Sequence, residues 1–287
     1  MKRILLCVDG SVFDQSTYRR GAWLAERLGA EITVLHVTNA QKEAQAKAKN
    51  LSGSIGFDAS DTLLKQLVEL EHQKSKLEHQ QAKQLLQSAE AALAQLGLNP
   101  VQTLHKTGAL VDCLPQLEGD VDLIVLGKRG TATEQSSGHL GANLERLIRA
   151  SRQPCLVTSR QFSEVERVLV AYDGSKTGQK MFEFLLSSPI FQGTALHLVK
   201  VAKDKGESAD QALLQAAASR TEAAGFSTTW TVLQGHAEKE LAAYIEANHI
   251  NLLLMGAYGH SRIRHLVIGS TTAQILRSSH IPVMVYR

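Results

Sequence analysis

The amino-acid sequence repeats itself, and this repeat constrains the fold more than any other feature. Residues 4–11 (ILLCVDGS) return as residues 168–175 (VLVAYDGS), 164 positions later. Residues 153–157 (QPCLV) return as residues 281–285 (IPVMV), 128 positions later. Because the two offsets differ by 36, the first copy carries about 36 residues that the second copy lacks. A chain that holds one unit twice is predicted to form two domains of the same fold.

Each copy shows an alternation of apolar strands with segments of helical spacing. In the second copy the predicted strands cover residues 167–172, 195–201, 228–233, 251–256 and 282–286. Their uninterrupted apolar runs are typical of strands that are covered on both faces. The predicted class is therefore α/β: two tandem, doubly wound, five-stranded parallel sheets with helices on both faces. The predicted domains are residues 1–160 and 161–287.

Two local features modify the first copy. Pro115 falls in the middle of its third helix and is expected to kink or shorten that helix. An extra helical segment covers residues 39–80, and no Gly or Pro interrupts the chain from Ser60 or Asp61 to Gly97. At 1.5 Å per residue, a helix of about 36 residues would be about 55 Å long. It is either an over-long second helix with a solvated outer half or an arm that packs on a partner subunit or covers a ligand.

Composition and charge exclude several classes of protein. The chain has 31 Lys and Arg against 28 Asp and Glu, a net charge of +3, and its basic residues form no cluster, so nucleic acid is not an expected partner. No run reaches the roughly 18 apolar residues of a membrane span, and the N-terminal apolar run is too short for a secretory signal. Three distant cysteines suit a reducing compartment. A cytoplasmic location is expected.

The stretch from Met255 to Thr272 carries the clearest chemistry. It leads from the end of a strand, through a loop with glycines at 256, 259 and 269, into a helix that is predicted to begin near Ser270. Glycines let an anion approach backbone N–H groups, and the first turn of a helix offers free N–H groups at the positive end of its dipole. The hydroxyls of Ser270 and Thr271 add donors. This pattern predicts a phosphate site, although glycines in such loops also serve as simple turn formers.

Other side chains bear on whether the chain also has further phosphate ligands, a metal site or a catalytic residue. Weaker phosphate candidates in the same loop are His260, Arg262 and Arg264. No Cys, Asp or Glu stands at ligand spacing from the loop histidines, so no metal site is predicted. Surface positions are expected for His36, His72 and His79. No nucleophile motif is present, and no catalytic residue is assigned.

The sequence resembles the universal stress protein family in its tandem, two-domain form. The family's nucleotide signature is Gly-x2-Gly-x9-Gly followed by Ser or Thr, and Gly256, Gly259, Gly269 and Ser270 match it. The Asp-Gly-Ser turns of both copies and the closing strand at residues 282–285 also fit. The resemblance covers the whole chain apart from residues 39–80.

The resemblance implies a strand order of 3-2-1-4-5 in each domain, which brings strands one and four together at the usual ligand crevice. It also implies ATP, with or without magnesium, as the ligand, no hydrolytic apparatus, and a dimer-like pairing of domains. A protein partner or a homodimer stays open.

Carried over residue by residue, the resemblance assigns a nucleotide site in the second copy. Asp173 would accept hydrogen bonds from the base or ribose, and Val201 would contact the adenine. The adenosine set is Ala171, Tyr172, Asp173, Val201, Met255 and Gly256, and the phosphate set is Gly259, Gly269, Ser270, Thr271 and Thr272. From the residues alone, Asp173 would equally serve as a helix cap or turn former, and Val201 as plain core.

The first copy departs from the signature. Ten residues rather than nine separate Gly130 from Gly141, and Ala142 stands where a hydroxyl is expected. Losing one hydrogen bond to a charged group lowers affinity by about ten- to hundredfold. Lys128 and Arg129 would still attract an anion. The resulting degenerate site consists of Asp9, Gly127, Gly130 and Gly141.

Three functions remain open at this level. The preferred one is a regulatory protein that holds ATP in the second domain. An enzyme that cleaves ATP slowly or transfers an adenylyl group is disfavoured, because no catalytic carboxylate pair or magnesium ligand stands beside the loop. The third is an adaptor whose pockets are empty or hold another small molecule, and which acts through residues 39–97 or through the domain interface.

Overall fold

The computed structural model describes residues 2–38, 57–128, 142–202, 207–257 and 269–287. The first half contributes the strands β1 (Arg3–Val8), β2 (Glu31–Thr38), β3 (Gln102–Thr107), β4 (Leu123–Gly127) and β5 (Cys155–Thr158). The second half contributes β6 (Arg167–Ala171), β7 (Ala195–Ala202), β8 (Ser227–Gln234), β9 (Leu252–Gly256) and β10 (Val283–Tyr286). The strands predicted for the second copy are confirmed to within one residue at each end.

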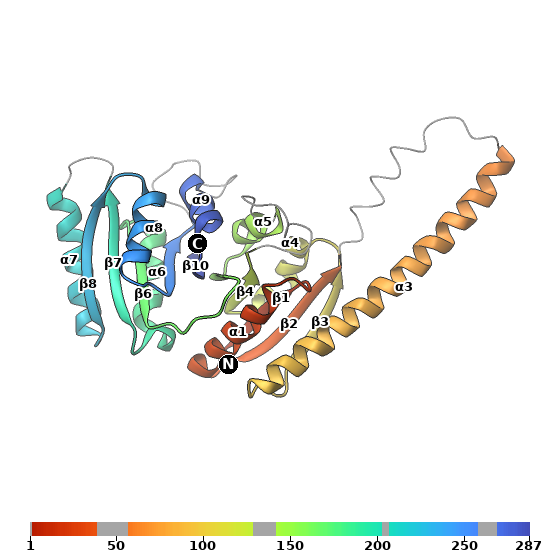
Figure 1. Ribbon diagram of the computed structural model, residues 1–287, viewed down its shortest axis with the longest axis horizontal. Helices are drawn as coiled ribbons and strands as arrows, with labels where there is room; N and C mark the ends of the chain where they lie inside the picture. Colours follow the sequence, from red (N-terminus) through yellow and green to blue (C-terminus); the bar gives the residue numbers. More distant parts are fainter. Residues whose placement is uncertain (1, 39–56, 129–141, 203–206, 258–268) are drawn as a thin grey trace.

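These strands form one sheet in the order β3-β2-β1-β4-β5-β10-β9-β6-β7-β8 (Figure 1). β1 pairs in parallel with β2 and β4, and β6 pairs in parallel with β7 and β9, so each half has the order 3-2-1-4-5. The halves meet where β5 and β10 pair antiparallel, with Leu156 opposite Met284. This joint agrees with the dimer-like pairing of domains that the resemblance implied.

Helices cover both faces of the sheet, which confirms the doubly wound α/β class. One face buries side chains of α1 (Asp14–Leu28), α3 (Phe57–Gln95), α6 (Lys176–Ser187) and α7 (Glu207–Ala223). The other face packs against α4 (Leu110–Cys113), α5 (Ala142–Ala150), α8 (Ala237–Ala247) and α9 (Ser270–Ser278). Among the described residues, none of these helices combines the length and apolar character needed to cross a bilayer.

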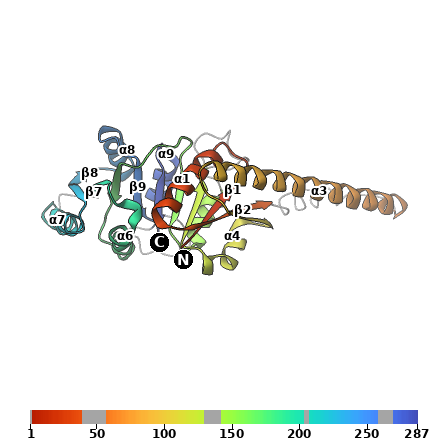
Figure 2. The same cartoon turned by 90° about the horizontal axis from the view of Figure 1, so that it is seen from below.

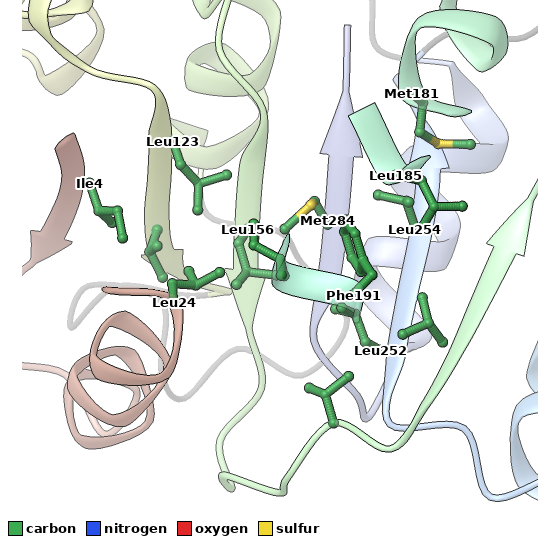
Figure 3. Close-up of a cluster of buried hydrophobic side chains, with 14 of the residues drawn as sticks. Ile4, Leu24, Leu123, Leu156, Met181, Leu185, Phe191, Leu252, Leu254 and Met284 are labelled. Carbon is green, nitrogen blue, oxygen red and sulfur yellow. The ribbon is translucent and has the colours of Figure 1, made fainter. Parts of the chain in front are cut away.

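The apolar core runs across the joint between the halves. The side chains of Leu156 and Met284 are both fully buried and belong to one cluster with Leu24 of α1 and Phe191. In Figure 3 these two side chains lie between Leu24 on one side and Phe191 on the other. Each half therefore completes the core of the other.

The third helix of the first half is broken, as Pro115 predicted. α4 contains four residues and is followed by two 3₁₀ turns, Leu114–Gln116 and Glu118–Asp120. Pro115 lies in the first of these turns, where its missing N–H is tolerated. In the interior of an α-helix, the missing N–H and the proline ring would break the hydrogen-bond pattern, so α4 ends before it. The corresponding α8 of the second half is 11 residues long.

α3 is far longer than the part of it that packs on the sheet. Its 39 residues span about 58 Å, and they include the predicted region from Ser60 or Asp61 onward. Ala82, Leu86, Ala89 and Leu93 are buried, whereas the outer half leaves the edge of the sheet (Figures 1 and 2). α3 is the over-long helix that the sequence predicts, and most of its described outer side chains are exposed in this chain. The choice between a solvated outer half and an arm that packs on a partner subunit or covers a ligand stays a prediction, and residues 39–56 lie outside the described chain.

Candidate functional site

The candidate site lies at the C-terminal ends of β6 and β9. These strands are neighbours in the sheet, and Ala171 is the register partner of Met255. From β6 the chain crosses to β7 on one side, while β9 lies on the other side. Such a reversal of strand order opens a crevice at the carboxyl ends of parallel strands.

Three of the predicted adenosine residues share one face of the sheet at this place. Met255 is buried, and Ala171 and Val201 are partly buried against the same apolar cluster, on the face covered by α8 and α9. Successive side chains of a strand point to opposite faces, so residues on different strands meet here only because their registers agree. The structure therefore places these three side chains on one face of the sheet, with Ala171 and Met255 in register.

The side chain of Tyr172 lies on the opposite face. Its ring packs 5.1 Å from the ring of Phe182, it is 6% exposed, and its N–H donates to the carbonyl of Val199 over 2.9 Å. Only its main chain follows Ala171 towards the crevice. The alternation of side chains along a strand was the signal in the sequence, because adjacent residues such as Ala171 and Tyr172 cannot both face one ligand.

Asp173 forms the turn that leads from β6 into α6. Its Oδ1 accepts a hydrogen bond from the N–H of Ser175 over 2.9 Å, and Ser175 in turn caps α6 by accepting from the N–H of Gly178 over 3.1 Å. Gly174 between them has a φ of +73°, in the left-handed region that favours glycine. Within the described chain no group donates to Oδ2 of Asp173, so the turn occupies only one oxygen of the carboxylate.

Gly178 keeps room for this carboxylate. A Cβ at position 178 would lie 2.7 Å from Oδ1 of Asp173, which is closer than the two atoms can approach. At the repeat offset of 164, the first copy has Asp14 in this place. The buried Asp14 carboxylate accepts from the N–H of Gly10 over 2.8 Å and from that of Asp9 over 3.5 Å.

The ends of β1 and β6 therefore differ in the number of carboxylates beside them. Burial, followed by the carboxylates of Asp14 and Asp9, raises the pKa of the Tyr18 phenol. Two carboxylates gathered at the end of β1 disfavour a further anion. Sequence reasoning missed Asp14, although an alignment of the two copies places it opposite Gly178.

α9 begins at Ser270 and presents its first turn beside the end of β9. Its N-cap is Gly269, which has no side chain to accept the first N–H groups. Ser270 and Thr271 are exposed. The N–H of Gly269 donates to the carbonyl of Ala257 over 3.4 Å, which holds the start of the helix close to the strand.

Thr272 has a different role from its two neighbours. It is 3% exposed, and its hydroxyl donates to the carbonyls of Ala257 over 3.2 Å and Gly256 over 3.3 Å. The hydroxyl thus ties α9 to the end of β9 rather than facing the crevice. Its backbone N–H still belongs to the first turn, where α-helices leave such groups without an internal acceptor.

Part of the predicted site lies outside the described residues. This holds for Gly259, His260, Arg262 and Arg264 in the second half, and for Gly130 and Gly141 in the first. Gly127 ends β4, and Oδ1 of Asp9 accepts from the N–H of Ser11 over 3.2 Å. In the described ranges no group of three or more His, Cys, Asp or Glu side chains is arranged to hold a metal ion.

Lys128 connects the halves instead of standing free beside the first crevice. Its Nζ donates to the carbonyls of Arg277 and Ser279, the latter over 2.8 Å, at the C-terminal end of α9. In a matching contact, Nη1 of Arg287 donates to the carbonyl of Arg149 at the end of α5. A cation at the negative end of a helix dipole is favourable, so each half caps a helix of the other.

The sequence profile of the universal stress protein family matches residues 1–159 and again residues 164–287. Universal stress protein Slr1230 of Synechocystis sp. is 52% identical over 287 residues, covering 100% of both chains.

Solved structures share the fold at lower identity. A universal stress protein from Archaeoglobus fulgidus DSM 4304 superposes with a TM-score of 0.66 at 22% identity, covering 99% of this chain and 95% of that one. A functionally unknown protein, PA1789, from Pseudomonas aeruginosa PAO1 gives a TM-score of 0.59 at 12% identity, covering 99% and 92%. At these identities the similarity shows a shared fold.

Proposed function

Because this chain belongs to the universal stress protein family, we propose that it is a regulatory protein that binds ATP in its second domain and is not an efficient hydrolase. In this proposal the domains are residues 1–160 and 161–287, and ATP binds alone or with magnesium. The bound state alters the contacts of the protein in the cytoplasm during stress.

One observation supports the proposal: the ends of β6 and β9 and the start of α9 lie together at one edge of the sheet. Ala171 and Met255 are paired at the ends of β6 and β9, and the Asp173 turn directly follows β6. The first turn of α9 is held against β9 by Thr272 and is capped by a glycine. Apolar side chains suit a base, a carboxylate suits a ribose or base donor, and a helix N-terminus suits phosphates.

The ligand that accompanies the purified protein tests this proposal. The protein is denatured, and the supernatant is analysed for adenine nucleotides by chromatography. Intact ATP is the expected result. ADP or AMP that accumulates with protein-dependent turnover would instead support the slow enzyme, and a protein that neither releases nor binds ATP would contradict the proposal.

Gly269→Val and Gly141→Val form a matched pair that tests which domain binds. A Cβ at position 269 would lie 3.5 Å from the carbonyl of Ala257 and 3.6 Å from the hydroxyl of Thr272, which is ordinary contact. A Cβ therefore has room at this position among the described residues, whereas an approaching phosphate would meet the added side chain. Gly269→Val is expected to weaken ATP binding at least about tenfold, measured by calorimetry, because it obstructs the helix N-terminus. Gly141→Val is expected to have little effect, and the reverse result would assign binding to the first domain.

The adaptor remains a second candidate, because one observation favours it. The outer half of α3 exposes large apolar side chains, among them Leu70 and Leu77. A binding role for this segment would be compatible with ATP in the second domain or independent of it.

A further inference from the structure

A hollow of about 980 Å³ lies where α1, the inner end of α3 and the linker between the two halves meet. α1 and the inner end of α3 pack side by side (Figure 1). The volume is at the upper end of the roughly 300–1,000 Å³ that is usual for ligand sites. We call this hollow the linker pocket, and its lining includes Trp23, Glu26, Leu96, Phe162, Glu164 and Glu166.

The linker pocket is separate from the nucleotide crevice. Several of its lining residues come shortly before a strand: Leu98 before β3, Glu166 before β6 and Gly193 before β7. The pocket therefore lies near the amino-terminal ends of these strands. The crevice lies at the carboxyl ends, so a ligand in one does not contact the other.

Apolar side chains in the pocket remain in contact with solvent. The rings of Trp23 and Phe162 are only half-buried, and Leu96 at the end of α3 is 41% exposed. Apolar side chains that stay exposed within a concave surface are typical of a binding site.

The charged side chains of the pocket favour a cationic ligand. Its three carboxylates are exposed: Glu26, Glu164 and Glu166. In the described part of the chain none of them takes part in an ion pair. Arg27 also lines the pocket, but its Nη1 donates to the carbonyls of Ile190 over 3.0 Å and Gln192 over 2.7 Å. Unpaired carboxylates attract a partner of opposite charge.

A buried guanidinium behind the aromatic rings makes a second demand. Arg20 is 2% exposed, and its Cζ lies 5.2 Å from the centre of the Trp23 ring and 4.6 Å from that of Phe162. Its Nη2 donates to the carbonyl of Ser163 over 2.9 Å, whereas Nη1 has no partner among the described residues. A buried donor without an acceptor costs free energy. At this corner a ligand gains by offering an acceptor rather than a cation.

These two demands together favour a peptide over a simple cation. A polyamine would satisfy the carboxylates, but it has no acceptor for Arg20. A peptide carries a carbonyl at every residue, and Lys or Arg side chains would add the positive charge. Apolar side chains of the same peptide would cover the rings of the pocket.

We propose that the linker pocket docks an extended segment of a partner protein in which basic and apolar side chains alternate. The basic side chains pair with Glu26, Glu164 and Glu166, and the apolar ones pack on Trp23 and Leu96. The half-buried ring of Phe162 turns aside, so that a main-chain carbonyl of the segment accepts from Nη1 of Arg20. This docking surface goes beyond the proposed ATP site and does not depend on it.

The fluorescence of Trp23 reports on the occupant directly. Trp230→Phe leaves Trp23 as the single tryptophan of the chain. This variant is titrated with a capped pentapeptide of alternating lysine and leucine, and a saturable change in emission is expected. The same peptide with glutamate in place of lysine is expected to give no change, and neither is spermidine.

Two matched pairs of variants, made in the Trp230→Phe chain, locate the binding. Glu164→Gln with Glu166→Gln is expected to weaken the lysine peptide about fivefold, because exposed ion pairs contribute modestly. Glu222→Gln with Glu246→Gln changes the net charge equally at exposed positions on α7 and α8, and it should leave the affinity unchanged. Leu96→Ala should weaken the peptide by a similar factor, whereas Leu77→Ala, on the outer half of α3, should not.

All four variants alter exposed side chains, and thermal unfolding checks that each keeps its fold. The proposal is overturned if the lysine peptide gives no saturable change. It is also overturned if spermidine binds as tightly as the peptide, or if both pairs of glutamine substitutions weaken binding equally. The last result would show attraction to the overall charge of the protein rather than to the linker pocket.

Discussion

At the scale of the residue, the two copies differ in the carboxylates that lie at the end of their first strand. In the second half Gly178 leaves room for the Asp173 carboxylate, which turns the chain with one oxygen. In the first half Asp9 accepts from the N–H of Ser11 in the same way, and the buried Asp14 carboxylate also accepts from the N–H groups of Gly10 and Asp9. The same Asp-Gly-Ser sequence therefore frames a crevice with one carboxylate in one copy and with two in the other.

Gly178→Ala tests whether the position of Asp173 matters to the ligand. The added Cβ would meet Oδ1 of Asp173 at 2.7 Å, so the carboxylate must shift. Alanine gains up to about 1 kcal/mol of helix propensity over glycine, which offsets part of the strain in the folded protein. We expect ATP affinity to fall by about tenfold, measured by calorimetry, because a charged hydrogen bond is displaced.

Asp173→Asn is the companion variant, because it keeps the acceptor of the turn and removes the charge. Thermal unfolding of both variants separates a folding defect from a binding defect. Unchanged ATP affinity in Gly178→Ala would mean that Asp173 serves the turn alone.

At the scale of the element, three histidine rings lie close together where α3 passes the edge of the sheet. The ring of His105 on β3 lies 5.9 Å from that of His36 on β2 and 5.3 Å from that of His79 on α3. Nε2 of His105 and the hydroxyl of Thr38 are 2.7 Å apart. Burial, followed by the charges of His36 and His79, lowers the pKa of His105 below its ordinary value.

This lowered pKa predicts that acid weakens the folded state. The unfolded chain takes up the proton on His105 at a higher pH than the folded chain does. The free energy of unfolding should therefore fall as the pH drops from about 7.5 to about 5.5. His105→Gln is expected to reduce this loss, measured by urea unfolding at both pH values.

His72→Gln provides the control for this measurement, since His72 is exposed on the outer half of α3. It should show the pH dependence of the natural chain. Equal pH dependence in His105→Gln and in the natural chain would exclude His105 as the source.

At the scale of the whole molecule, the ten strands form one sheet with a core that both halves share. Leu156 and Met284 face each other across the joint of β5 and β10, and both are fully buried in a core that draws on both halves. Lys128 and Arg287 add polar contacts across the same joint. Neither half buries its edge strand without the other.

We therefore predict that both halves unfold together. The chain has two tryptophans, Trp23 in the first half and Trp230 in the second. Trp230→Phe and Trp23→Phe leave one fluorescent reporter in each half, and their urea transitions should coincide. Adding Leu156→Ala should cost about 2–5 kcal/mol and shift both transitions equally. A shift confined to the first half would show that the halves fold separately.

Local patterns in the sequence determined the parts of the fold that neighbouring residues control. Uninterrupted apolar runs located the strands, Pro115 shortened the third helix, the absence of Gly and Pro predicted α3, and the helix start at Ser270 was correct. The order of the strands could be predicted only through the family resemblance, which rests on the repeat and the loop motif. In the described part of the site, the convergence of Ala171, Val201 and Met255 could be predicted in the same way.

The tertiary structure alone decided which atoms are free to act. The hydroxyl of Thr272 is taken up by two carbonyls, Lys128 reaches across the joint to α9, and the ring of Tyr172 packs against Phe182. The three neighbouring histidines, His36, His79 and His105, come from three separate segments. Spacing along a chain reports periodicity and turns, whereas a hydrogen bond or a buried face depends on what the folded chain places opposite each group.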